Sequence, residues 1–176
     1  MKNIRQKKDF EKNLYDWFIA NERFFSKRIK RFLAMYFPDA RIRRKFWLAT
    51  NVKLGENTYL NPNVVVADDY QRNKILLEIG SNCSIAPGIV FAPISTHNNS
   101  KILRRMKILN RYEVKKPIII GSDVWIGANC TIIGGVKIGK CSIIGANSFV
   151  NKDIPDYSLA YGSPVQIIKD LREKNV

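Results

Sequence analysis

Apolar residues recur every six positions over the stretch from Ile120 to Pro155. The stretch divides into the blocks IGSDVW, IGANCT, IIGGVK, IGKCSI, IGANSF and VNKDIP, and each block begins with an aliphatic residue. A period of six fits neither an α-helix nor an alternating strand. It fits a solenoid in which short strands turn a corner every six residues, so that the opening side chains stack in columns inside the coil. Glycine and asparagine beside these corners tolerate the positive φ that such a turn needs.

The same period begins earlier in the chain. Repeats open at Leu54, Leu60 and Val66, and again at Ile79, Ile85 and Phe91. The step from Val66 to Ile79 is one residue longer than two repeats, so we expect a bulge or a loosened corner around residues 69–73. The next position in phase after Phe91 is His97, the only histidine in the sequence.

The repeat then disappears over residues 98–117, which read NNSKILRRMKILNRYEVKKP. A long connection without a repeat is uncommon inside a compact domain unless it is functional or disordered. Its basic residues predict a flexible wall that can meet phosphates: Lys101, Arg104, Arg105, Lys107 and Arg111.

Apolar residues at three- and four-residue steps predict one amphipathic helix, or two in sequence, between Ile4 and Phe37. Pro38 ends the pattern, because proline cannot continue a helix. Several interpretations of this segment stay open, and a phosphate-bearing acceptor or nucleic acid is among the partners that its charge allows. It is a cap that lays its aromatic residues on the β-structure with its basic residues in solvent, or it associates with an anionic membrane face through residues 1–45.

The composition is strongly basic, with 30 Lys and Arg against 15 Asp and Glu, which indicates anionic partners. No recognised nucleic-acid motif accompanies the charge, so we expect no nucleic acid. The three cysteines lack metal-ligand spacing and indicate a reducing, cytoplasmic setting, peripheral to the membrane if the helical segment binds lipid. No apolar run is long enough to span a membrane, and the N-terminus lacks the apolar region of a signal peptide.

Three segments, DVWIGANCTIIGGVKIG, IIGANSFVNKDIP and YGSPVQIIK, resemble the hexapeptide-repeat acyltransferases, in the branch of galactoside, maltose and polysaccharide O-acetyltransferases. The resemblance covers roughly residues 50–170. It implies an all-β solenoid, a left-handed parallel β-helix. Residues 1–50 form a helical segment, and residues 51–176 form the β-helix domain, with about five coils and a short C-terminal tail. It also implies acetyl-CoA as the acyl donor, no metal, and a homotrimer with active sites between subunits.

The resemblance places the catalytic base at His97, within ISTHNNS. Acyl transfer from a thioester to a hydroxyl needs a base for the hydroxyl proton, and neutral imidazole suits that task near pH 7. The matching acceptor-binding segment is TYLNPNVVVADDY, where Asn61 and Asp69 take the family's sugar-contacting positions. Asp68 is the neighbouring candidate, and the alternative roles are a repeat corner for Asn61 and a turn for Asp69.

Coenzyme A requires a slot for its pantetheine arm and basic residues for its phosphates. Trp125 matches the family tryptophan beside that slot, and its place one residue before a repeat opening turns its side chain outward; its alternative role is subunit packing. The resemblance adds Ala128 and Ala146 along the pantetheine, and Asn151, Lys152 and Lys169 near the nucleotide. Gln166 departs from the family, which more often has a basic residue there.

These observations predict an acetyl-CoA-dependent O-acetyltransferase that acts on a saccharide or a saccharide-bearing acceptor. N-acetylation of an amino sugar and acetylation of an antibiotic stay open, because the same base serves an amine or a drug hydroxyl. A single histidine excludes the three-histidine zinc site of γ-class carbonic anhydrases. The N-terminal segment is too short for the helical domain of serine acetyltransferases. A non-catalytic solenoid that docks on a membrane or a partner is the alternative of another class.

Overall fold

The computed structural model describes residues 2–68, 74–97 and 99–172. Its N-terminal part is helical, with α1 (Lys2–Ala20), the 3-10 turn η1 (Glu22–Phe24), α2 (Lys27–Tyr36) and α3 (Ala40–Leu48). The predicted helical stretch up to Phe37 is therefore two helices in sequence. Ser26 caps the second of them, because its hydroxyl accepts a hydrogen bond from the Ile29 N–H at 3.4 Å. The α2 helix ends before Pro38, as predicted.

Helix α3 has no counterpart among the elements predicted from the sequence. Its start is set by Asp39, whose carboxylate accepts hydrogen bonds from the N–H groups of Arg41 at 2.8 Å and Ile42 at 3.2 Å. An aspartate after a proline is a common helix start, so Pro38-Asp39 was the available signal.

Most strands of the described chain lie in three sheets, and the pairings within them are parallel except between the last two strands of the second sheet. Sheet A contains β1 (Val52–Leu54), β4 (Leu77–Ile79), β9 (Ile118–Ile120) and β12 (Lys137–Ile138). Sheet B contains β2 (Tyr59–Leu60), β5 (Ser84–Ile85), β10 (Trp125–Ile126), β13 (Ile143–Ile144), β15 (Ser158–Tyr161) and β16 (Gln166–Asp170). Sheet C contains β3 (Val65–Val66), β6 (Val90–Ala92), β11 (Thr131–Ile133) and β14 (Phe149–Val150).

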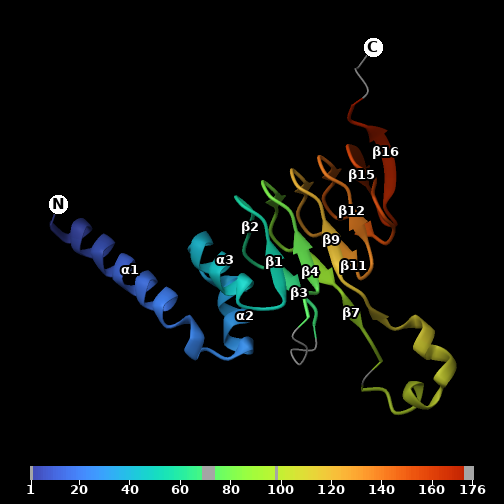
Figure 1. The fold of residues 1–176 in the computed structure, drawn as a ribbon, viewed down its shortest axis with the longest axis horizontal. Helices are drawn as coiled ribbons and strands as arrows, with labels where there is room; N and C mark the ends of the chain where they lie inside the picture. The colour runs from blue at the N-terminus through green and yellow to red at the C-terminus, as the bar shows by residue number, and fades with distance from the viewer. Residues whose placement is uncertain (1, 69–73, 98, 173–176) are drawn as a thin grey trace.

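The chain visits these sheets in the fixed order A, B, C. In the described residues the cycle is completed four times, and a fifth begins with Ile154, which bridges Ile138, and continues into β15. The strands stack side by side from β1 and β2 near the helices to β15 and β16 at the far end (Figure 1). A six-residue repeat therefore produces one short strand per sheet, and three repeats produce one turn of a three-sided coil.

The predicted columns of aliphatic side chains are confirmed. The six opening residues of the C-terminal blocks are all buried, with 0–2% of their surface exposed: Ile120, Ile126, Ile132, Ile138, Ile144 and Val150. Each is in register with its counterparts in the neighbouring turns, as Ile126 is with Ile85 and Ile144. The core is one continuous apolar axis along the coil.

The predicted role of the repeat glycines needs a correction. The corners do place asparagines at positive φ, such as Asn129 and Asn147 at 57° each. The glycines that follow the aliphatic residues serve a different purpose. A Cβ at Gly127 would lie 2.6 Å from the Ala146 nitrogen, and one at Gly121 would lie 2.7 Å from the Lys140 nitrogen. Glycine is required there because successive turns come too close for any side chain.

The excursion from the repeat begins as a two-stranded antiparallel ribbon of β7 (Ile94–Ser95) and β8 (Val114–Lys115). Two 3-10 segments lie between them, η2 (Leu103–Arg105) and η3 (Lys107–Tyr112), and Figure 1 shows them projecting from the strand stack. This ribbon corrects the prediction that His97 occupies a column position. The chain has left the coil by then, and β9 continues sheet A in its place. The bulge predicted at residues 69–73 lies outside the described residues.

Helices α2 and α3 cover the first turn of the coil. Ile42, Phe46 and Trp47 of α3 are buried in the same core as the first strands. Two arginines are buried with them. Arg43 donates to the carbonyl oxygens of Leu60, Phe37 and Pro38 at 2.7–3.1 Å, and Arg31 donates to the Val66 carbonyl at 2.6 Å and forms an ion pair with Asp68. The segment is a cap, as one interpretation predicted, but not all of its basic residues are in solvent. Backbone carbonyls at the end of the coil need donors, and the long arginine side chains supply them.

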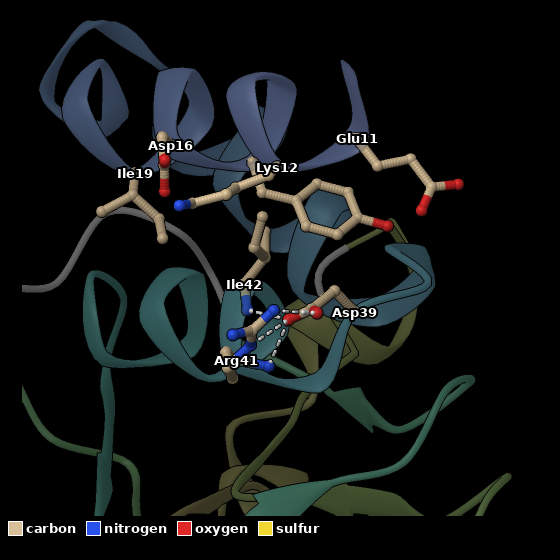
Figure 2. A pocket seen from close by; sticks show the side chains of 8 residues that line it. Glu11, Lys12, Asp16, Ile19, Asp39, Arg41 and Ile42 are labelled. Carbon is tan, nitrogen blue, oxygen red and sulfur yellow. Dashed lines mark hydrogen bonds and ion pairs between the residues drawn. The ribbon is translucent and has the colours of Figure 1, made fainter. Parts of the chain in front are cut away.

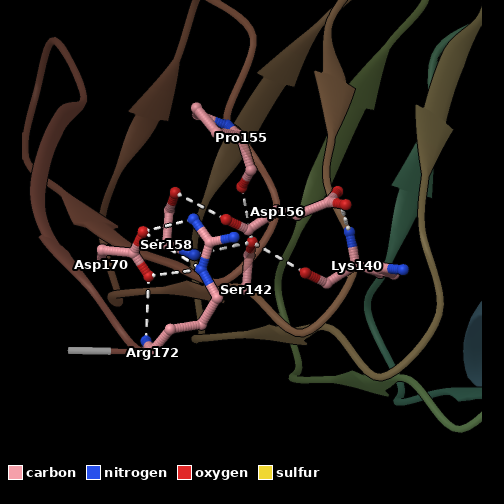
Figure 3. Close-up of polar contacts among 7 residues, drawn as sticks. All are labelled: Lys140, Ser142, Pro155, Asp156, Ser158, Asp170 and Arg172. Carbon is pink, nitrogen blue, oxygen red and sulfur yellow. Dashed lines mark hydrogen bonds and ion pairs between the residues drawn. The ribbon is translucent and has the colours of Figure 1, made fainter. Parts of the chain in front are cut away.

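At the opposite end of the coil sheet B finishes in an antiparallel hairpin, since β16 pairs with β15. Figure 3 shows the polar contacts beneath it, where the Ser142 hydroxyl donates to the Pro155 carbonyl at 2.8 Å and accepts from the Ser158 N–H at 3.1 Å. Asp170 pairs with Arg172 at the end of the hairpin, and this contact lowers the pKa of the Asp170 carboxyl to about 2. The predicted C-terminal tail is therefore an ordered strand as far as Asp170.

Candidate active site

The excursion places His97 opposite Glu113. Strands β7 and β8 run antiparallel, so the residues that follow one strand and precede the other face each other. The His97 Nδ1 atom lies 3.3 Å from the Glu113 Oε1 atom, and both side chains are largely buried. A carboxylate at Nδ1 favours the tautomer with its proton on Nδ1, which leaves the Nε2 lone pair available to accept a proton.

Glu113 is held as an anion by its surroundings. Lys115 forms an ion pair with the other carboxylate oxygen, and this contact is the main reason why the pKa of Glu113 lies below its ordinary value of 4.5. The neighbouring His97 contributes in the same direction. Near pH 7 the carboxylate is charged and can orient the imidazole. Glu113 was not among the residues predicted from the sequence, although it is the only acidic residue among residues 98–117.

This pair lines an open cavity of about 340 Å³, whose other lining residues are Ser95, Thr96, Leu103, Leu109 and Tyr112. The lining therefore combines the hydroxyl groups of Ser95 and Thr96 with apolar side chains from η2 and η3. A second hollow of about 340 Å³ is lined by Lys101, Arg104 and Arg105 on the outer part of the same excursion. The arrangement combines a base, a place for a small polar substrate and a basic surface nearby.

The residues predicted to bind the acceptor are only partly described. The Asn61 side-chain amide donates to the Ile85 carbonyl at 2.8 Å, so this side chain braces the adjacent turn of the coil. Asp69 lies outside the described residues. Asp68, the neighbouring candidate, is buried against Arg31, and the Asn51 amide also approaches it at 3.5 Å. A carboxylate committed to an internal ion pair cannot bind a sugar, which removes Asp68 as a substitute.

The residues predicted to bind coenzyme A lie farther along the coil. Trp125 is on β10 in sheet B with 55% of its surface exposed, which agrees with the predicted outward position. Ala128 and Ala146 occupy equivalent corners of successive turns, and the Ala128 carbonyl accepts from the Asn147 N–H at 2.9 Å. Asn151 and Lys152 are exposed after β14, and the Lys152 ammonium donates to the Gln166 side chain at 3.3 Å. Lys169 lies on β16, opposite Leu159.

One chain does not bring all of these residues together. His97 follows β7 in the ribbon that leaves the coil between sheet C and sheet A, whereas Trp125 lies on sheet B. In a three-sided coil the corner between sheets C and A is across the core from sheet B. The candidate base and the candidate cofactor tryptophan therefore lie on opposite sides of the same coil.

Two further findings concern metal sites and membrane spans. Among residues 2–68, 74–97 and 99–172, no group of three or more His, Cys, Asp or Glu side chains could hold a metal ion. In the same ranges, no helix has the length and apolar character needed to cross a bilayer.

Comparisons with known proteins agree with the repeat. Residues 117–152 match the family model for the bacterial transferase hexapeptide (six repeats). The chain is 36% identical over 130 residues to galactoside O-acetyltransferase of Escherichia coli (strain K12), an alignment that covers 74% of this chain and 59% of that protein. The chain therefore spans about three fifths of that curated relative.

Solved structures give the same result. A galactoside acetyltransferase in complex with coenzyme A has a TM-score of 0.65 at 26% identity, covering 88% of this chain and 83% of the other. A hexapeptide-repeat-containing acetyltransferase from Vibrio cholerae complexed with acetyl coenzyme A has a TM-score of 0.65 at 27% identity, covering 84% and 86%. The resemblance drawn from the sequence is confirmed: this chain carries the hexapeptide transferase repeat, and its relatives include galactoside O-acetyltransferases.

Proposed function

We propose that this hexapeptide-repeat chain is an acetyl-CoA-dependent O-acetyltransferase, with His97 as general base and a saccharide hydroxyl as acceptor. The observation that carries the proposal is the His97–Glu113 pair inside a cavity that a small polar substrate can enter. The likeness to proteins that bind coenzyme A and acetyl coenzyme A supports the choice of donor. From the same likeness we infer that the three-sided coil is left-handed, although parallel crossovers in other folds are usually right-handed.

In the proposed reaction, Nε2 of His97 removes the proton from the acceptor hydroxyl as its oxygen attacks the thioester carbonyl carbon. The proton then passes from the imidazolium to the departing sulfur, which restores the neutral base and releases coenzyme A. Glu113 holds the imidazole by Nδ1 in both protonation states and stabilises the imidazolium. Asn61 and Asp69 are the proposed contacts to the saccharide.

We assign the coenzyme A site to Trp125, which would cover the pantetheine arm beside Ala128 and Ala146, with Asn151, Lys152 and Lys169 near the nucleotide. Lys152 is exposed, so its ammonium group is accessible to a phosphate. Gln166 beside it can form a hydrogen bond, whereas the family more often has a basic residue at this position. The phosphates would then depend on Lys152, Lys169 and the basic residues of the excursion.

The active unit in this proposal is a homotrimer. His97 and Trp125 lie on opposite sides of one coil, so a site that contains both must take them from two neighbouring copies. Cyclic symmetry repeats such a contact as three equivalent sites. A stable monomer that still turns over would contradict this part of the proposal, and light scattering during activity would detect it. The three free cysteines fit the cytoplasmic setting in which we place the reaction.

The test is release of the coenzyme A thiol from acetyl-CoA over a panel of sugars, nucleotide sugars, oligosaccharides, amino sugars and drug alcohols. With an active acceptor, His97→Ala should lower kcat by about 10²- to 10⁴-fold and leave acetyl-CoA affinity nearly unchanged, since the base acts in the transition state. Asn99→Ala, in an exposed position of the same excursion, is the matched control. Full turnover by His97→Ala would exclude the proposed mechanism, and acetylation of amines alone would exclude the proposed acceptor.

A further inference from the structure

Helix α2 has an unusual distribution of side chains. Ile29, Phe32 and Tyr36 recur at steps of three and four, so they share one face of the helix. This face is exposed, at 47%, 61% and 50% of the respective residue surfaces, and the ring centroids of Phe32 and Tyr36 are 5.2 Å apart. The buried residues of the helix are Arg31 and Ala34. We call Ile29, Phe32 and Tyr36 the α2 stripe.

The burial of Arg31 explains why this stripe faces outward. The Arg31 guanidinium bonds the Val66 carbonyl and pairs with Asp68, and it lies 5.2 Å from the Trp47 ring. These contacts fix the rotation of α2 on the coil and turn its opposite face into solvent. A large apolar face in water is unfavourable unless something covers it, so such a patch on a folded protein indicates a partner.

Helix α1 repeats the arrangement. Phe10, Leu14 and Trp17, spaced by four and three, are exposed at 67%, 38% and 53%; we call them the α1 stripe. The adjoining face of the helix meets the cap through Tyr15 and Phe18, whose rings lie 5.6 and 5.1 Å from that of Phe37. The half-exposed Trp17 ring borders this contact, 5.4 Å from the ring of Phe18 and 6.2 Å from that of Phe25. A pocket of about 380 Å³ separates α1 from α3 (Figure 2), so the two helices are not packed along their whole length.

The charge of the cap decides what kind of partner fits. Residues 1–50 contain fourteen Lys and Arg and five Asp and Glu. Arg23, Arg28 and Lys45 are exposed, and the Arg23 guanidinium lies 4.8 Å from the ring of Phe24, which is itself 71% exposed. Two copies of this cap placed face to face would bring like charges together, which opposes self-association. An anionic surface would neutralise the charge.

From this combination we infer that the cap binds the surface of an anionic phospholipid membrane, with the α1 and α2 stripes in the headgroup and upper acyl region. Aromatic and aliphatic side chains beside Lys and Arg are the pattern of a helix that lies in such an interface. The attachment is peripheral, because none of the described helices meets the length and apolar content of a membrane span. It is separate from the proposed transferase site, which uses none of these residues.

The experiment is sedimentation of the full chain with phosphatidylcholine vesicles and with vesicles that also contain phosphatidylglycerol. We expect at least about tenfold tighter binding to the anionic vesicles, weakened by added salt. Brominated acyl chains in those vesicles should quench tryptophan fluorescence, and Trp17→Phe should remove most of the quenching because Trp17 is in the α1 stripe.

Two variants separate the apolar and charge contributions. Serine at Ile29, Phe32 and Tyr36 together should weaken binding by about tenfold or more, and serine at Ile167, Ile168 and Leu171 on the C-terminal hairpin is the matched control, also exposed. Arg23→Gln with Arg28→Gln should weaken it by about fivefold per charge, with Lys74→Gln and Lys137→Gln as controls.

Several outcomes would overturn the inference. One is equal or negligible binding to both kinds of vesicle. Another is unchanged binding by the α2 stripe variant, which would mean nonspecific electrostatic adsorption. A third is a changed oligomeric state of that variant in light scattering, which would show that the stripe contacts another copy of the chain. Turnover on a soluble acceptor should be unaffected by the stripe variant, so failure here would leave the proposed transferase function standing.

Discussion

The coils between Ile118 and Val150 and the helical cap use side chains in opposite ways. In the coils, an aliphatic side chain turns inward at every sixth residue. In α2, Arg31 turns inward and Phe32 turns outward. The difference teaches that a repeat buries its residues by position, because each turn presents the same environment. A cap buries the side chains that can donate hydrogen bonds to carbonyl groups at the end of the coil, here Arg31 and Arg43.

The largest expected effect comes from breaking the polar contact of the cap. Arg31→Met leaves the buried Asp68 carboxylate without its guanidinium partner, which should lower the free energy of unfolding by about 3–5 kcal/mol. The double variant Arg31→Met with Asp68→Leu should recover most of the loss, because it removes both charges. Urea unfolding measures both variants. Arg28→Gln on the exposed part of the same helix is the control, and an equal loss there would contradict the comparison.

The corresponding change in the coils is the removal of methyl groups. Ile126→Ala leaves a cavity in the central column and should cost about 2–5 kcal/mol of unfolding free energy. Ile167→Ala on β16, where the side chain is 45% exposed, should change it by no more than about 0.5 kcal/mol. Similar losses in both variants would show that the repeat position does not determine burial.

A smaller effect is expected where the chain leaves the coil. Glu113→Gln keeps the shape of the side chain but removes the charge that holds His97, and it should lower kcat by about tenfold with the KM for acetyl-CoA unchanged. Glu113→Asp should restore part of the activity. Glu78→Gln is the matched control, because Glu78 also pairs with a lysine, Lys53, but lies in sheet A. A loss of thermal stability instead of turnover in Glu113→Gln would mean that the residue is structural.

The smallest effect concerns the exposed pair at the end of the C-terminal hairpin. The pKa of Asp170 in the folded chain is about 2, below its ordinary 3.8, so between these values the unfolded chain binds more protons than the folded one. The stabilisation by Arg172 is thus complete above about pH 4 and is lost as the pH falls toward 2. Asp170→Asn should be less stable than the parent at neutral pH, and the difference should disappear near pH 2. Urea midpoints across this range, with Asp123→Asn as control, would reveal a pH-independent difference if the assignment were wrong.

The sequence by itself determined the regular part of the molecule. A period of six is compatible with few structures. It therefore predicts the columns from Ile120 to Val150, the asparagine corners and the outward position of Trp125. The two N-terminal helices and their end before Pro38 were also predictable, because capping and proline act within a few residues. His97 was found as a candidate base from its motif.

Only the tertiary structure decided the irregular parts. That His97 stands outside the column and faces Glu113 depends on antiparallel pairing of β7 with β8, which no local pattern encodes. That Arg31 and Arg43 lie inside while Phe32 lies outside depends on carbonyl groups of the first turn of the coil, distant in sequence. The physical reason is the same in each case: periodicity reports an environment that repeats along the chain, whereas these contacts join segments that meet only once.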